Sequence, residues 1–184
     1  MAAIAKRTRP GTKRMGTLPR RAASLIEVTV VLLDDGYAST AVGPIEVFHS
    51  AGRLWNILAG TPEEPRFRVR VASIDGRPVS SVCALGLTPS LSIQDVRHTD
   101  IVILPSSGLD TQDRIARHTP LLPWLKKWHA RGAYVAGVCT GVAFLAESGL
   151  LDGRMATTHW SVAEGMRQRY PKVDWRPDLF VTED

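Results

Sequence analysis

Long apolar runs and clustered cysteines are both missing from this sequence of 184 residues. No stretch of 18 apolar residues is present to cross a membrane, and no apolar leader core is present to direct secretion. The two cysteines, Cys83 and Cys139, lie far apart and form no C-x-x-C pair. A disulfide framework is therefore excluded, and we expect free thiols in a reducing cytoplasm.

Motifs for metals and phosphates are also missing. The sequence contains no H-E-x-x-H, no paired C-x-x-C and no acidic cluster with ligand spacing, so no metal site is expected. Glycine-rich loops of the dinucleotide or Walker type are absent too, and no cofactor is expected. The five tryptophans are not interleaved with basic residues, which argues against a surface that stacks nucleic-acid bases.

Acidic residues are missing from positions 1–23, which hold seven Lys or Arg residues. The rest of the chain carries 16 bases against 18 acids, so the formal net charge of +5 belongs to this segment. Its Pro and Gly content predicts a disordered basic tail. An organelle transit peptide and a loose arm for nucleic acid are the alternatives. Residues 24–184 are long enough for one domain, whose near-neutral charge does not suit a nucleic-acid surface.

Strand and helix patterns alternate through that domain. Buried, non-alternating strands separated by helices predict an α/β fold with a mostly parallel sheet and helices on both faces. A short antiparallel hairpin is expected over 79–87, and one helical turn over 92–96. The expected strands are 26–33, 67–74, 100–104, 133–136 and 155–158, and the expected helices are 41–58, 119–132, 142–147 and 161–170.

The segment Gly137-Val138-Cys139-Thr140-Gly141 joins a predicted strand to a predicted helix. Small residues on either side of a central nucleophile are typical of a nucleophile elbow. A thiol at a helix N-terminus is favoured as a thiolate, and the N–H groups there could hold an oxyanion. The alternative is a buried structural cysteine in a strand–helix turn.

Several polar residues follow predicted strand ends, where parallel sheets bind ligands. They are Asp34, Ser106, Ser107, Cys139 and His159. His159 is the candidate base for Cys139, one strand–helix–strand step further on, if the two strands are neighbours. A half-buried structural histidine is the alternative. The acidic member of a triad is not found, because Asp34 and Asp35 also fit ordinary turn chemistry.

Four segments together resemble the PfpI-like, class I glutamine amidotransferase-like superfamily. They are Gly43-Pro44-Ile45-Glu46-Val47-Phe48, Asp100-Ile101-Val102-Ile103-Leu104-Pro105, the elbow, and residues 150–160 with the sequence LLDGRMATTHW. The last two are particularly similar to the sensor domain of GlxA-type AraC-family transcription regulators. The resemblance implies a flavodoxin-like sandwich, usually dimeric, and a DNA-binding helix-turn-helix pair that would follow this domain. None is visible, so we expect a domain truncated at its C-terminal end.

The resemblance also implies roles for individual residues. Cys139 takes the place of the elbow cysteine and His159 that of its histidine, while Ser106 and Ser107 fall on the loop that supplies an oxyanion donor. Enzymes of the superfamily carry an Asp or Glu where this chain has Thr40. That departure favours a ligand-binding descendant over a working enzyme.

Three hypotheses follow. The first is a dimeric sensor domain that binds a small molecule near Cys139 and His159. Its expected ligand-binding residues are Asp34, Thr40, Ser106, Ser107 and Thr140. The second is an enzyme that uses Cys139 and His159, with the N–H groups of Thr140 and Ser107 as oxyanion donors. The third is a redox sensor in which Cys139 oxidises reversibly.

Overall fold

Strand β1 (Ile26–Val31) lies at the centre of a five-stranded parallel sheet. The computed structural model describes residues 24–183, so the predicted tail over 1–23 lies outside the described residues. The sheet has the order β5-β2-β1-β6-β7, in which every neighbouring pair is parallel, as the sequence predicted. The other four strands are β2 (Phe67–Ser73), β5 (Leu91–Ser92), β6 (Ile101–Leu104) and β7 (Tyr134–Gly137).

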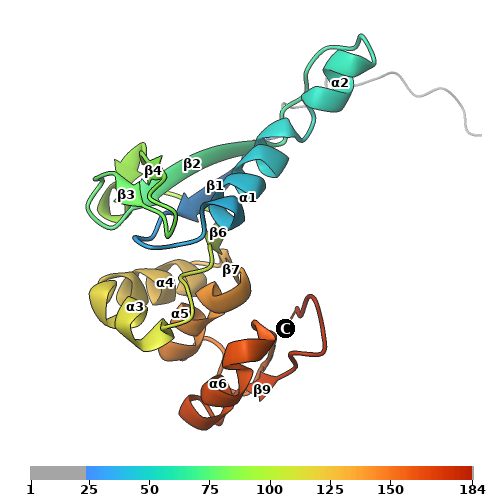
Figure 1. Cartoon of the computed structure of the whole chain (residues 1–184). Helices are drawn as coiled ribbons and strands as arrows, with labels where there is room; N and C mark the ends of the chain where they lie inside the picture. The colour runs from blue at the N-terminus through green and yellow to red at the C-terminus, as the bar shows by residue number, and fades with distance from the viewer. Residues whose placement is uncertain (1–23, 184) are drawn as a thin grey trace, which may run out of the picture.

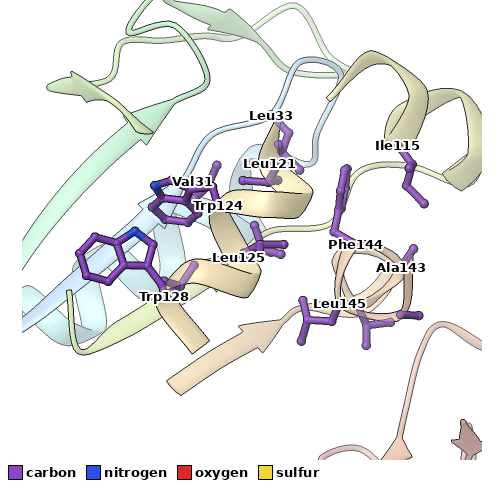
Figure 2. Close-up of a cluster of buried hydrophobic side chains, with 14 of the residues drawn as sticks. Val31, Leu33, Ile115, Leu121, Trp124, Leu125, Trp128, Ala143, Phe144 and Leu145 are labelled. Carbon is purple, nitrogen blue, oxygen red and sulfur yellow. The ribbon is translucent and has the colours of Figure 1, made fainter. Parts of the chain in front are cut away.

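Helices cover both faces of this sheet, because the apolar residues of β1 point alternately to either side. Val28 and Val30 belong to one buried cluster, which α1 (Ala38–Ser50) covers. Val31 belongs to the other, with residues of α4 (Leu121–Ala130) and α5 (Val142–Glu147). Figure 2 shows this second cluster, in which the indole of Trp124 lies beside Val31 and the ring of Phe144 comes from α5. A strand that is apolar on both faces is typical of a covered parallel sheet.

The strand order reverses beside β1. The chain runs from β1 to β2 and β5 on one side, and then to β6 and β7 on the other. In open α/β sheets, the carboxyl ends of the strands at such a reversal form a crevice that binds ligands. Here the loops after β1 and β6 meet, since the N–H of Tyr37 donates to the carbonyl of Ser106 at 3.0 Å.

The helix predicted over 41–58 is wrong in one respect, because the chain breaks it into α1 and α2 (Leu54–Leu58). Gly52 lies between them with φ +74°, and the N–H of Glu64 donates to its carbonyl at 2.7 Å. A Cβ at Gly52 would lie 2.0 Å from the Glu64 carbonyl oxygen, so only glycine permits this close turn. Figure 1 shows α2 projecting away from the sheet.

The smaller elements follow the predictions in part. The expected hairpin is present as β3 (Val79–Ser80) and β4 (Gly86–Leu87), and the helical turn as η1 (Ile93–Asp95). Helix α3 (Thr111–Arg117) was not predicted. Only Ile115 of α3 is buried, so the helix leaves little apolar periodicity in the sequence. The remaining elements are η2 (Cys139–Gly141), β8 (Met155–Ala156), η3 (Trp160–Val162), α6 (Ala163–Arg169) and β9 (Asp174–Trp175).

Within residues 24–183, no helix combines the length and the apolar character that crossing a membrane requires.

Candidate functional site

Cys139 stands on a nucleophile elbow between β7 and α5. Its φ of +56° places it in the left-handed region, which side chains other than glycine rarely adopt. The backbone there is crowded, because a Cβ on Gly137 would lie 2.6 Å from the Cα of Val142. A strained residue held by tightly packed neighbours is typical of functional sites. The sequence predicted this turn from its small residues.

A pocket of about 910 Å³ lies beside the elbow. Its walls are the whole of β7, the chain around β8, and the C-terminal segment over 177–183. Both Cys139 and His159 line it, so the structure places the two sequence-predicted residues in one cavity. Large apolar side chains stand exposed among its lining residues, namely Tyr134, Trp160, Phe180 and Val181.

The route by which His159 reaches the pocket differs from the expected one. The prediction required its strand to be the neighbour of β7, but β8 pairs with β9 in a separate two-stranded sheet. The connection to the elbow is a side-chain contact instead, in which the hydroxyl of Thr158 donates to the Cys139 carbonyl at 3.3 Å. A two-residue strand carries too little pattern to identify its partner from sequence.

The hydrogen bonds of His159 define its tautomer. Its Nδ1 accepts from the backbone N–H of Ser161 at 3.2 Å, and the Ser161 hydroxyl lies 2.7 Å from the same nitrogen. The proton of the neutral imidazole therefore sits on Nε2. In this state the free nitrogen of the ring, Nε2, offers a hydrogen-bond donor and has no lone pair with which to accept a proton. No hydrogen bond joins it to the Cys139 thiol in the part of the chain that the structure describes.

The hydroxyl residues lie behind the elbow rather than in the pocket. Thr140 Oγ1 accepts from the N–H of Ser107 at 3.1 Å and lies 2.9 Å from the Ser106 hydroxyl. The N–H of Ser106 in turn donates to Thr40 Oγ1 at 3.0 Å. Since the Ser107 N–H already has a partner and Ser107 is fully buried, it is not presented as an oxyanion donor in this structure. None of these four residues is among those that line the pocket.

Asp34 lies apart from Cys139. Its side chain is exposed, accepts from the N–H of Ser80 at 3.1 Å, and lines a different cavity. Several lining residues of the Cys139 pocket were not predicted from the sequence, among them Arg154 and Glu183. Arg154 belongs to the LLDGRMATTHW segment, but only the C-terminal part of that segment suggested chemistry. Among the described residues, no group of three or more His, Cys, Asp or Glu side chains is arranged to hold a metal ion.

Cys83 is expected to be alkylated by iodoacetamide before Cys139. The Cys83 thiol is exposed, and the Ser81 hydroxyl 3.2 Å away and the Leu85 backbone lower its pKa. A lower pKa gives more thiolate at neutral pH, and the thiolate is the nucleophile. Cys139, by contrast, is half-buried. Peptide mass spectrometry over a time course measures both rates.

The variant Ser81→Ala checks the physical cause. It should slow alkylation of Cys83 and leave Cys139 unchanged, because only the first thiol contacts this hydroxyl. Faster labelling at Cys139 than at Cys83 in the unmodified chain would contradict the prediction and indicate an activated elbow thiol.

Known proteins resemble this chain along most of its length. The sequence profile of the DJ-1/PfpI family matches residues 27–183. The HTH-type transcriptional regulator CdhR of Pseudomonas aeruginosa is 31% identical over 115 residues, which are 62% of this chain and 33% of CdhR. The HTH-type transcriptional regulator GlxA of Rhizobium meliloti is 29% identical over 133 residues, covering 71% of this chain and 39% of GlxA. The isonitrile hydratase of Pseudomonas putida is 31% identical over 108 residues, which are 58% of this chain and 45% of the hydratase.

Two solved structures show the same fold. An AraC family transcriptional regulator from Pseudomonas putida superposes with a TM-score of 0.67 at 23% identity, covering 83% of this chain and 76% of that one. A ThiJ/PfpI family protein from Pseudomonas syringae gives a TM-score of 0.66 at 21% identity, covering 88% of this chain and 60% of that one. The chain spans about a third of the length of CdhR.

Proposed function

Because the chain belongs to the DJ-1/PfpI family, we propose that it is the small-molecule-sensing domain of a transcription regulator of the AraC/GlxA type. The similarity to CdhR and GlxA supports the regulator context. In this proposal the ligand occupies the pocket of about 910 Å³ beside the elbow. DNA contact is assigned to the rest of such a regulator, since the relatives are much longer than this chain.

The observation that carries the proposal is that several groups expected of an enzyme, though not the Thr140 N–H, are engaged elsewhere or replaced. The N–H of Ser107 donates to Thr140, and that of Ser106 donates to Thr40. Thr40 itself replaces the carboxylate expected of the enzymes, and Nδ1 of His159 is occupied by Ser161. A transition state that develops an oxyanion needs donors with no other partner. A ligand that is bound and released unchanged develops no oxyanion, so its binding does not require these free donors.

A labelling experiment tests the proposal. The Cys83→Ser variant leaves Cys139 as the single thiol, and a library of amino acids, small amines and small carboxylates is added before iodoacetamide. We expect at least one compound to slow the alkylation of Cys139, to raise the melting temperature, and to be recovered unchanged. Turnover of the compound that is lost in Cys139→Ala would overturn the sensor assignment.

The alternative is a cysteine-dependent enzyme, which the similarity to isonitrile hydratase favours. Its reaction adds water to an isonitrile and gives an N-substituted formamide. We expect this chain to form no formamide from an alkyl isonitrile above the level seen with Cys139→Ala. Formation that depends on Cys139 would support the enzyme instead.

Dimerisation belongs to the same proposal, and α2 is the surface that we assign to it. Trp55 and Leu58 are 78% and 72% exposed, and no residue of α2 is buried. Four of the five residues of α2 are apolar, the exception being Asn56, and a helix with this much apolar surface is normally covered. Leu54 and Ile57 are also exposed, at 55% and 57%, so four apolar side chains of α2 are open to a partner. A standard interface buries roughly 800 Å² on each partner. A second copy would present the same patch across a twofold axis.

The double variant Trp55→Glu/Leu58→Glu is expected to be monomeric where the unmodified chain is dimeric. Two carboxylates in an apolar interface cannot be buried without partners. Size-exclusion chromatography with light scattering measures the mass. The control is Trp160→Glu, which places one such carboxylate at another tryptophan that is 77% exposed. A monomeric unmodified chain, or a double variant that stays dimeric, would contradict this assignment.

A further inference from the structure

A second cavity, of about 560 Å³, lies at the carboxyl ends of β1 and β2. It shares no lining residue with the Cys139 pocket. Leu32, Ile74 and Val79 form its apolar wall, and Asp34 and His118 are among its polar residues. The proposed sensing mechanism uses none of these side chains. The position is one where open α/β sheets bind ligands.

His118 provides a hydrogen-bond acceptor in this cavity. The residue is only 5% exposed, and its Nδ1 lies 2.7 Å from the carbonyl oxygen of Arg114. A carbonyl can only accept, so Nδ1 carries the proton and Nε2 keeps its lone pair. Burial lowers the pKa of His118, which keeps the ring neutral. Within residues 24–183, only Nδ1 of this ring forms a hydrogen bond. Nε2 is not among the fully buried polar atoms without a partner, so it is open to the cavity that His118 lines.

Carboxylates add negative charge beside this nitrogen. Asp34 accepts one backbone hydrogen bond, from Ser80, and forms no ion pair in the described part of the chain. Asp75 also lines the cavity and lies 3.5 Å from Arg77, whose side chain is 84% exposed. The second arginine of the lining, Arg117, forms ion pairs with Asp35 at 3.0 Å and with Asp113 at 2.8 Å. Oδ2 of Asp34 and Nε2 of His118 therefore remain available as acceptors among the described residues.

We propose that this cavity binds a small primary amine in its ammonium form, with its N–H groups donating to Asp34 and to Nε2 of His118 and its carbon chain against Leu32, Ile74 and Val79. A quaternary ammonium does not fit this chemistry, because it carries no N–H donor. Its usual recognition by an aromatic cage also has no basis here, since no Trp, Tyr or Phe lines the cavity. A simple anion does not fit Asp34 and Nε2 of His118, since both are acceptors, and it would contact Arg77 and Arg117 of the lining instead.

Nuclear magnetic resonance titrations of the whole chain test the proposal with three probes at matched ionic strength: propylammonium, tetramethylammonium and acetate. We expect saturable shifts of the backbone amides of Asp34, Ile74 and His118 with propylammonium, and binding of tetramethylammonium that is about tenfold weaker or undetectable. Equal binding of the two cations, tighter binding of acetate, or no saturable shift with propylammonium would overturn the assignment.

Three variants locate the site. Asp34→Asn changes an exposed side chain and keeps an acceptor for the Ser80 N–H, and it should weaken propylammonium binding about tenfold. Asp152→Asn removes the same charge from a position that lies in neither cavity, and it should leave the affinity unchanged. Cys139→Ala should also leave it unchanged, which separates this site from the proposed sensing pocket. An Asp34→Asn variant that binds as tightly as the Asp152→Asn variant would refute the proposal.

Discussion

Replacing Gly141 with alanine is expected to lower the free energy of unfolding by about 3 kcal/mol or more. The added Cβ would lie 2.3 Å from the carbonyl oxygen of Pro105 and 2.6 Å from that of Leu104. Neither oxygen belongs to a flexible side chain. The Leu104 carbonyl is also held in place, because it accepts from the N–H of Val138 at 2.8 Å. Denaturant unfolding of the purified variant measures the loss.

Backbone strain does not explain this expected loss. Gly141 has φ −59°, which alanine adopts readily, so the cost is the collision alone. The control is Gly43→Ala in the middle of α1, where an added Cβ meets nothing within 4 Å. That change should raise stability by about 0.5–1 kcal/mol, because glycine is a poor helix former. Equal stabilities for the two variants would mean that the elbow does not pack against the end of β6.

The elbow and the central strands could be predicted because their signals are local. The apolar run around Val30 needs no knowledge of distant residues, and neither do the small residues around Cys139. The break at Gly52 could not be predicted in the same way. It depends on the carbonyl of Glu64, twelve positions further on, which lies where a side chain would be. The apolar spacing on either side is helical and so indicated one continuous helix.

The site was harder to predict than the fold, because its residues interact across the chain. Ser107 and Thr140 were both identified from sequence, but their hydrogen bond joins two loops 33 positions apart. That bond turns an expected oxyanion donor into a structural contact. Pairing of β8 with β9 likewise depends on a partner far along the chain. The residue types predicted which side chains lie near the elbow. Which of their atoms face the pocket depends on how those side chains pack in the fold.

The two cavities divide the polar residues that sequence analysis grouped together. Cys139 and His159 line one cavity, and Asp34 lines the other, with the hydroxyls of Thr40, Ser106 and Thr140 bonded to backbone and to one another behind the elbow. A parallel sheet places the loops of all its strands at the same edge, but the helices that follow separate that edge into compartments. Two residues that follow neighbouring strand ends can therefore line two separate cavities, and their position alone does not show that they share one site.

Thr140→Val is expected to lower the free energy of unfolding by about 2–4 kcal/mol, although the two side chains have nearly the same shape. Thr140 is fully buried, and its hydroxyl is the partner of both the Ser107 N–H and the Ser106 hydroxyl. Valine leaves the first without an acceptor and removes one partner of the second. Each buried polar group left without a partner costs about 1–3 kcal/mol. The nearby Ser107 hydroxyl is already buried without a hydrogen-bond partner.

The conservative variant Thr140→Ser separates the hydroxyl from the methyl group. It keeps the oxygen and loses one methyl, which costs about 1 kcal/mol. A double-mutant cycle with Ser106→Ala should give a coupling energy of about 0.5–3 kcal/mol, as expected for two groups in direct contact. If Thr140→Val were no less stable than Thr140→Ser, the Ser107 N–H would have found another acceptor, such as water. It would then be accessible, and the main argument against oxyanion stabilisation beside Cys139 would fail.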